Sequence, residues 1–190
     1  MTIGIYGGSF DPIHTGHAVV ANFVAQCGLV DEVWITVAKQ NPLKTDRVLA
    51  HENQRITMAE IVASLCSGVR VCDIEMELPH PSYTINTLNE LKRRFEEYDF
   101  RLIIGSDSYR NFERWKSADE IRQNYGLIVY PRPGYPLPKD EPGNTVFLNG
   151  APEFSISSSL IREYCKSRWN INYFVPPQIA QYIINHNLYL

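Results

Sequence analysis

The stretch GGSFDPIHTGH, Gly7–His17, joins the first apolar run of the chain, Ile3–Tyr6, to a segment with helical periodicity. Apolar residues recur with a helical period from Val19 to Cys27, and Gly28 is suited to end that helix. The paired glycines have no Cβ, so we expect the backbone to turn sharply there and a phosphate to approach closely. The stretch therefore predicts a buried strand that turns into a helix N-terminus.

The rest of the chain alternates between apolar runs and helical patterns. Further strands are expected at residues 33–38, 69–74, 100–104 and 126–130, with a strand-like segment at 145–148. Helices are expected around Ile61–Cys66 and Ile85–Phe95, and a final helical segment follows Pro176. This alternation predicts an α/β fold with a doubly wound, mostly parallel sheet, built as a single domain over residues 1–190. Ligands of such sheets bind beyond the carboxyl ends of the strands.

Composition and charge narrow the functional class. The net charge is -3, so no basic excess points to general affinity for nucleic acid or for an anionic membrane. The four cysteines form no CxxC pair and no zinc pattern. No secretory leader opens the chain and no apolar run is long enough to span a bilayer. We therefore expect a cytoplasmic protein that binds neither nucleic acid nor membrane.

Two histidines lie where the first helix is predicted to begin. His14 and His17 are three residues apart, so both imidazoles can lie on one side of the first helical turn, beside free backbone N–H groups. Gly16 between them keeps that surface open, and the arrangement suits a polyphosphate. A capping role for His14 and a fragment of a metal site are the alternatives. The stretch has neither the Gly-Lys-Ser/Thr ending of a Walker A loop nor the spacing of GxGxxG.

A second candidate anion site lies near the other end of the chain. The segment ISSSLIR, Ile156–Arg162, places several serines directly before a helical run. Serine is favoured at helix N-termini, and Arg162 is one turn further on, where a permanent cation can reach back toward an anion. The alternative is a plain serine cap with a solvent-facing arginine.

The two segments together carry a resemblance to a known family. GGSFDPIHTGH resembles the GxFxPxHxGH signature of the nucleotidyltransferase superfamily that shares HxGH with class I aminoacyl-tRNA synthetases, and ISSSLIR resembles the ISSTxIR signature of its adenylyltransferases. Four further segments resemble the bacterial nicotinate-nucleotide adenylyltransferases: PSYTINTLNEL (81–91), LIIGSDSYRNFERWKSADEI (102–121), PRPG (131–134) and YIINHNLY (182–189). The resemblance covers nearly the whole chain in order. Two positions differ from the family pattern. Ser159 stands where the family usually has threonine, and the loop NPLK, Asn41–Lys44, lacks the histidine that the family often has before the lysine.

The resemblance implies a Rossmann-like nucleotidyltransferase fold and an enzyme that joins ATP and nicotinate mononucleotide into deamido-NAD and pyrophosphate. The attacking phosphate oxygen is already anionic, so no general base is needed to create it. Catalysis then consists of positioning and of neutralising charge on the α-phosphate and on pyrophosphate. Mg²⁺ is expected to arrive with ATP, with no metal ligands from protein side chains.

The same resemblance implies roles for particular residues. The expected catalytic residues are His14, His17 and Arg162. The expected ATP site also includes Gly7, Gly8, Ser9, Phe10, Gly105, Ser106, Asp107, Ile156, Ser157 and Ser158. Asp107 has a helix cap as its alternative role.

For the mononucleotide, the expected residues are Lys44, Thr84, Thr87, Trp115 and Arg132. Trp115 is expected to stack on the pyridinium ring, and packing beside Phe112 is its alternative. The two threonines are expected at the nicotinate carboxylate, with ordinary helix caps as the alternative. Lys44 and Arg132 are candidates for the mononucleotide phosphate or are solvated surface charges.

Three other functions remain open at this point. Phosphopantetheine adenylyltransferases share both signatures, but usually have threonine and asparagine where this chain has His14 and Thr15. An enzyme that prefers the amide, nicotinamide mononucleotide, differs by one charged group of the substrate, which the loops do not settle. A non-catalytic nucleotide sensor would be expected to lack a histidine of the HxGH pair or Arg162. The sequence also leaves the oligomeric state open, and a homo-oligomer is compatible with the family.

Overall fold

A computed structural model describes residues 1–39, 50–79, 81–140 and 142–190. Its centre is a six-stranded sheet in which every strand pairing is parallel. The strands are β1 (Thr2–Gly8), β2 (Glu32–Val37), β3 (Val69–Cys72), β4 (Asp99–Gly105), β5 (Leu127–Tyr130) and β6 (Thr145–Phe147). Their order in the sheet is β3-β2-β1-β4-β5-β6, which is the doubly wound order of the Rossmann fold. The predicted fold class is confirmed.

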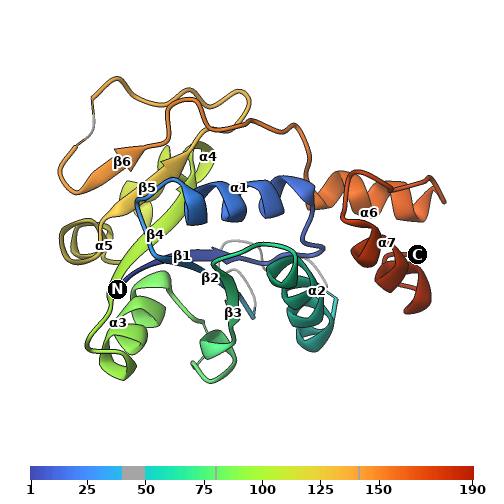
Figure 1. Cartoon of the computed structure of the whole chain (residues 1–190), viewed down its shortest axis with the longest axis horizontal. Helices are drawn as coiled ribbons and strands as arrows, with labels where there is room; N and C mark the ends of the chain where they lie inside the picture. The colour runs from blue at the N-terminus through green and yellow to red at the C-terminus, as the bar shows by residue number, and fades with distance from the viewer. Residues whose placement is uncertain (40–49, 80, 141) are drawn as a thin grey trace.

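Helices cover both faces of this sheet, and their bounds follow the apolar residues that they bury. The elements are α1 (Thr15–Gln26), α2 (Glu52–Ser64), η1 (Ile74–Met76), α3 (Thr84–Arg94), α4 (Ser106–Tyr109), η2 (Phe112–Arg114), α5 (Ala118–Asn124), α6 (Ser158–Lys166) and α7 (Pro177–Asn185). Strand side chains alternate between two cores. Tyr6 of β1 belongs to the core that includes residues of α1, α2, α6 and α7, whereas Ile3 and Ile5 belong to the core that includes residues of α3 and α5. In Figure 1, α6 and α7 lie together past the end of β1, next to α2.

Three local predictions are wrong. The strand expected at 69–74 is β3, which ends at Cys72, and Ile74 begins η1. The helix expected around Ile61–Cys66 is α2, which begins nine residues earlier than Ile61, at Glu52, and ends at Ser64. Its buried face is formed by Arg55, Met58, Ala59 and Val62. The first turn of the helix is polar, so the spacing of apolar residues does not indicate that the helix begins there. The glycine pair does not turn either. Gly7 and Gly8 are the last residues of β1 and pair with Thr36 and Val37 of β2.

The reason for the glycines is side-chain packing. A Cβ on Gly8 would lie 2.9 Å from the ring of Phe10, and one on Gly7 would lie 3.3 Å from the hydroxyl of Thr36. The positive φ of 45° falls on Phe10 instead, whose ring is buried against Tyr6 and His17. The chain therefore leaves the sheet at Ser9 and Phe10, two residues later than predicted.

The order of the strands fixes where a ligand site is expected. β1 lies in the middle of the sheet, and its connections lead first to β2 and β3 on one side and then to β4, β5 and β6 on the other. The reversal leaves a crevice at the carboxyl ends of β1 and β4, where ligands of doubly wound sheets bind. The loop that starts at Ser9 lies at this point.

Candidate active site

His14 and His17 cap α1 reciprocally. His14 is the N-cap residue, and its Nδ1 accepts the backbone N–H of His17 at 3.3 Å, while Nδ1 of His17 accepts the backbone N–H of His14 at 3.2 Å. The two rings stack with their centroids 3.6 Å apart. Because both Nδ1 atoms accept hydrogen bonds, the proton of each neutral ring is on Nε2. The pair therefore offers two Nε2–H donors that no other tautomer would supply.

Both histidines are held in the neutral state. Burial lowers the pKa of His14 to about 3, with the positive charge of Arg132 as the second cause. Burial also holds the pKa of His17 well below its ordinary value, with smaller effects from His14 and Arg132. Edge-on contacts with Phe10 and Tyr6, whose centroids lie 5.0 and 6.1 Å from that of His17, account for this apolar environment. The site provides hydrogen-bond donors without free imidazolium charge.

The N-terminus of α1 is less open than predicted. The backbone N–H of Thr15 donates to the carbonyl of Phe174 at 3.0 Å, and that of His17 is occupied by the His14 ring. Gly16 is buried, and a Cβ there would lie 3.1 Å from Cε1 of His14, so the glycine makes room for the ring that caps the helix. The expectation of a bare helix end is wrong because the chain satisfies these amides itself.

Hydrogen bonds bring the two sequence motifs together. Nη1 of Arg162 donates to the backbone carbonyl of Asp11 at 2.7 Å, and its Nη2 donates to Oγ of Ser159 at 2.9 Å. The Ser158 hydroxyl donates to the carbonyl of Pro12 at 2.9 Å. Ser157 is the N-cap of α6, and its hydroxyl oxygen accepts the N–H of Leu160. The first turn of α6 is thus bonded to the loop of the first motif, 146 residues away in sequence.

A cavity of about 500 Å³ opens at the start of the same loop, at Gly7, Gly8 and Ser9. Its lining comes from the carboxyl ends of β1, β2 and β4, from η1, from the start of α3 and from the segment around η2. The lining residues are Ile5, Gly7, Gly8, Ser9, Thr36, Ala38, Glu75, Ser82, Tyr83, Thr84, Thr87, Leu102, Ile103, Ile104, Asn111, Arg114, Trp115 and Lys116. The histidines and Arg162 are not among them. Gly7, Gly8 and Ser9 line the cavity, and the loop that follows them in the chain carries the histidine pair.

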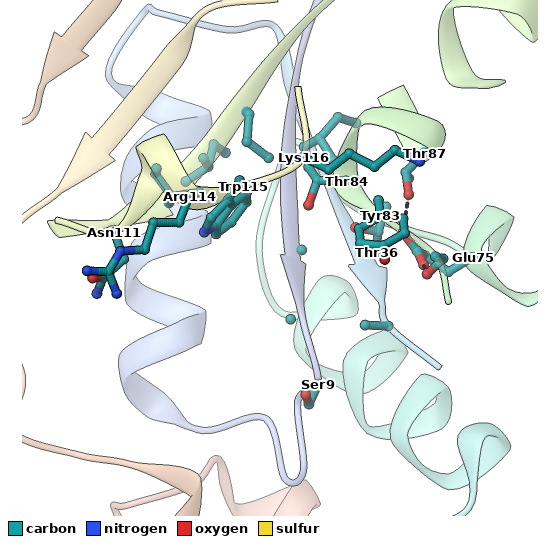
Figure 2. Close-up of a pocket in the computed structure, with 18 residues that line it drawn as sticks. Ser9, Thr36, Glu75, Tyr83, Thr84, Thr87, Asn111, Arg114, Trp115 and Lys116 are labelled. Carbon is teal, nitrogen blue, oxygen red and sulfur yellow. Dashed lines mark hydrogen bonds between the residues drawn. The ribbon is translucent and has the colours of Figure 1, made fainter. Parts of the chain in front are cut away.

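Two walls face each other across this cavity. Figure 2 shows Trp115 and Asn111 on one side of β1, and Thr84, Thr87 and Glu75 on the other. Trp115 is half-buried, and its ring packs on Phe112 with centroids 5.5 Å apart, so it lines the cavity from a fixed position. The ammonium of Lys116 lies 4.5 Å from the centroid of the Tyr83 ring, which links the two walls.

Glu75 is a residue of this cavity that the sequence did not single out. It is a buried carboxylate in η1 that accepts hydrogen bonds from the hydroxyls of Ser82 and Thr87. The hydroxyl of Thr87 is therefore directed at a side chain of the protein, whereas the half-buried Thr84 lines the cavity as the first residue of α3. Neither threonine acts as a helix cap, because Tyr83 is the N-cap residue. The segment IEME, Ile74–Glu77, contains Glu75 and Glu77, and nothing in the sequence indicates which of the two side chains is buried.

Four further predicted residues, Gly105, Ser106, Asp107 and Arg132, lie around the start of α4. Gly105 ends β4, and the hydroxyl of Ser106 accepts the N–H of Arg132 at 2.9 Å. Nε of Arg132 lies 3.9 Å from a carboxylate oxygen of Asp107. Arg132 is thus placed with Asp107, and its charge also acts on the two histidines, whereas it is not among the residues that line the cavity with Trp115. Its proposed contact with the mononucleotide phosphate stays a prediction. The side chain is at this position because the loop after β5 is bonded to the start of α4.

The last two predicted site residues are Ile156 and Lys44. Ile156 is half-buried and packs against the core shared with α1 and α6. Lys44 lies outside the described residues. Over residues 1–39, 50–79, 81–140 and 142–190, no group of three or more His, Cys, Asp or Glu side chains is arranged to hold a metal ion. In the same ranges no helix is both long and apolar enough to cross a membrane.

Comparison with known proteins places these features in a family. The model of a family described as Cytidylyltransferase-like matches residues 5–164. A Bacteroides fragilis protein named "Probable nicotinate-nucleotide adenylyltransferase" is 40% identical over 181 residues, which are 95% of this chain and 90% of the relative. A Flavobacterium psychrophilum protein of the same name is 38% identical over 196 residues, covering 100% of this chain and 99% of the relative.

A solved structure supports the same fold. The Plasmodium falciparum nicotinic acid mononucleotide adenylyltransferase complexed with NaAD superimposes with a TM-score of 0.81 at 23% identity, over 99% of this chain and 97% of that one. Its likeness concerns the fold, whereas the two bacterial relatives are similar in sequence over their length. The chain belongs to the cytidylyltransferase-like family and, within it, to the nicotinate-nucleotide adenylyltransferases.

Proposed function

We propose that this chain transfers the adenylyl group of ATP to nicotinate mononucleotide, giving deamido-NAD and pyrophosphate. The single observation that carries the proposal is that one segment of the chain belongs to two candidate sites: Gly7, Gly8 and Ser9 line a cavity of about 500 Å³, and the loop that follows them carries the histidine pair and accepts a hydrogen bond from Arg162. A reaction that joins two nucleotides needs such adjacent sites, with the reacting phosphates meeting between them. The names of the bacterial relatives support this choice of substrates.

The mononucleotide occupies the cavity in this proposal. Its pyridinium ring stacks on Trp115, which is held by Phe112, and its carboxylate meets the N-terminus of α3 at Thr84. Lys116 lines the same space and adds positive charge for a substrate with an acid group. Thr87 contributes through Glu75, because its hydroxyl is bonded to that carboxylate.

ATP binds at the histidine pair and Arg162 in this proposal. The Nε2–H groups of His14 and His17 donate to the triphosphate, with His17 assigned to the α-phosphate. Arg162 and the first turn of α6, including Ser157, hold the β- and γ-phosphates. Gly105, Ser106 and Asp107 frame the adenosine end. Arg132, placed beside Asp107, belongs with this side of the site.

The chemistry is an in-line displacement. An anionic oxygen of the mononucleotide phosphate attacks the α-phosphorus of ATP, the new P–O bond forms, and the bond to pyrophosphate breaks. The neutral histidines donate hydrogen bonds to charge that grows on the transferred group, and the guanidinium of Arg162 meets the charge of the departing pyrophosphate. No side chain has to remove a proton from the nucleophile.

Mg²⁺ is proposed to enter with ATP. The histidines do not suit a metal, because their Nδ1 atoms already accept backbone N–H groups and their Nε2 atoms carry protons. The phosphate oxygens of ATP are the hard ligands that Mg²⁺ prefers. When bound, the ion offsets phosphate charge and polarises the bond to pyrophosphate.

The test is pyrophosphate release by the purified protein with magnesium-ATP and one acceptor at a time. The acceptors are nicotinate mononucleotide, nicotinamide mononucleotide and phosphopantetheine. We expect kcat/KM to be highest for nicotinate mononucleotide. A higher value for the amide or for phosphopantetheine would replace the proposed acceptor, and no release with any acceptor would favour a nucleotide sensor.

The role of the cavity is tested with a matched pair of tryptophan variants. Trp115→Ala removes the proposed stacking surface and should raise KM for nicotinate mononucleotide about tenfold or more. Trp169→Ala changes an exposed tryptophan after α6 and should leave this KM unchanged. Equal KM values in the two variants would contradict the placement of the substrate.

A further inference from the structure

Asp11 is a buried carboxylate that the proposed mechanism does not use. It lies in the middle of the first motif and is 1% exposed. Its Oδ1 accepts the backbone N–H of Ala50 at 3.1 Å and the hydroxyl of Tyr189 at 2.8 Å. Its backbone carbonyl accepts Nη1 of Arg162 at 2.7 Å, and its Oδ2 lies 4.0 Å from the same nitrogen. Asp11 thus joins the tail of the chain to the arginine assigned to the triphosphate.

Tyr189, the penultimate residue, is held in this position by the tail itself. Leu188 is buried and its N–H donates to the carbonyl of Ile183 in α7. The backbone of Tyr189 has a φ of 65°, a left-handed conformation that is unfavourable for a tyrosine and is maintained only where the surroundings determine it. Burial, together with the charge of Asp11, raises the pKa of the Tyr189 hydroxyl, so this group remains a donor at every working pH.

A buried arginine completes the same cluster. Arg55 of α2 is fully buried, and its Nη1 donates to the carbonyls of Ser9 at 2.8 Å and Ala38 at 2.6 Å. The positive charge of Arg55 lowers the pKa of the Tyr189 hydroxyl, but burial and the charge of Asp11 have the larger, opposite effect. The backbone that leaves β1 is therefore fixed at Ser9 by Arg55 and at Asp11 by its own contacts, so the hydroxyl from the tail acts on a segment with little freedom to compensate.

We propose that Tyr189 is a positioning residue for the adenylyl transfer: its hydroxyl holds the Asp11 carboxylate, and Asp11 in turn holds the Arg162 guanidinium in the orientation that binds ATP. This inference rests on the proposed function, because it takes Arg162 as a ligand of the triphosphate. A long cationic side chain has many rotamers, and each anchor reduces the entropy that it loses on binding. The last residues of the chain thus contribute to a site built by its first residues.

The test removes only the hydroxyl. Tyr189→Phe keeps the ring and its packing, and should raise KM for magnesium-ATP, and the Kd measured by calorimetry, about tenfold, the size of one hydrogen bond to a charged group. KM for nicotinate mononucleotide should stay within twofold. Tyr182→Phe is the matched control, since Tyr182 lies in the preceding helix and stacks on His186. We expect it to match the wild-type protein in all three constants.

A double-mutant cycle with Arg162→Lys separates positioning from general support of the fold. If the hydroxyl acts through Arg162, Tyr189→Phe should change the ATP constants less than twofold in the Arg162→Lys background. A tenfold effect in both backgrounds, equal losses for the two substrates, or no effect in the wild-type background would each overturn the proposal. Calorimetric ATP binding does not depend on the acceptor, so a wrong acceptor would appear in turnover alone.

Discussion

At the scale of single residues, His14 and His17 serve the helix and the proposed site with different atoms. Their Nδ1 atoms close the first turn of α1, and this leaves both Nε2–H groups as donors. A capping role and a phosphate-binding role, which are alternatives in the sequence, are therefore compatible in the structure. The physical link is the tautomer: the hydrogen bond at one nitrogen fixes the proton on the other.

The role of His17 leads to a first prediction. His17→Ala should lower kcat about 100-fold, because a donor to charge that develops in the transition state is lost. His186→Ala, at an exposed histidine after α7, should leave kcat unchanged. Turnover is measured by pyrophosphate release at saturating substrates. A kcat within fivefold of the wild-type value would contradict the assignment of His17 to the α-phosphate.

The depressed pKa of His14 predicts how stability depends on pH. Its folded pKa of about 3 lies below the ordinary histidine value of 6.5, so between these values the unfolded chain binds a proton that the native protein does not. The free energy of unfolding should therefore be constant above about pH 6.5 and fall as the pH decreases toward 3. Between about pH 6.5 and about pH 5, the titration of His14 should lower the free energy of unfolding by about 2 kcal/mol.

Urea denaturation of the wild-type protein and of His14→Gln at about pH 7.5 and about pH 5 measures this contribution. Glutamine does not titrate, so the variant should lose less stability than the wild-type protein over this interval. His186→Gln is the control and should lose as much as the wild-type protein. An equal loss in His14→Gln would contradict a neutral, buried His14.

At the scale of elements, the N-terminal end of α3 depends on a buried carboxylate. Glu75 accepts the hydroxyls of Ser82, before the helix, and Thr87, in its first turn. The two bonds fix the segment that carries Thr84 into the cavity. Because Glu75 precedes α3 by nine residues and comes from η1, the proposed carboxylate site depends on two elements and not on the helix alone.

Glu75→Gln should therefore weaken the binding of the mononucleotide. Glutamine retains one oxygen, and its amide group cannot accept the second hydroxyl, so one buried hydroxyl must reorient or lose its partner. We expect KM for nicotinate mononucleotide to rise about tenfold and kcat to change less. Glu77→Gln, at a neighbouring exposed carboxylate paired with Arg94, is the control and should leave KM unchanged. Equal behaviour of the two variants would contradict the role of Glu75.

At the scale of the whole molecule, the two ends of the chain share one core. Tyr6 and Val24 from the first elements pack in the same buried cluster as Ile161 of α6 and Ile183 of α7. We therefore propose that residues 1–190 form one domain, the organisation expected from length. A shared core has few contacts that can separate without exposing apolar surface, so unfolding should be cooperative.

This organisation predicts a single urea transition. Trp34 in β2 and Trp169 after α6 report on distant parts of the chain. In a Trp115→Phe background, a second substitution, Trp34→Phe or Trp169→Phe, leaves a single tryptophan whose fluorescence can be followed. Both fluorescence transitions should share one midpoint with the loss of helix measured by circular dichroism. Separate midpoints for Trp34 and Trp169 would show that the C-terminal elements unfold independently.

The sequence by itself determined the parallel α/β architecture, because buried strands and amphipathic helices leave periodic apolar patterns in the chain. It also determined the family, through GGSFDPIHTGH and ISSSLIR, since chemistry requires particular residues at close spacing. It did not find the start of α2, whose buried face includes Arg55, because a buried charge is read as a surface residue when its partners are unknown. Glu75 was missed for the same reason.

Only the tertiary structure decided how distant residues share partners. Arg132 is next to Asp107 and not in the cavity with Trp115, and the helix end at Thr15 is already bonded to the carbonyl of Phe174. GGSFDPIHTGH predicted an anion site from local pattern, but its Asp11 is held by Arg162 and Tyr189, from 151 and 178 residues away. Such contacts depend on how the layers pack, and local periodicity contains no information on the partners that a folded chain brings together.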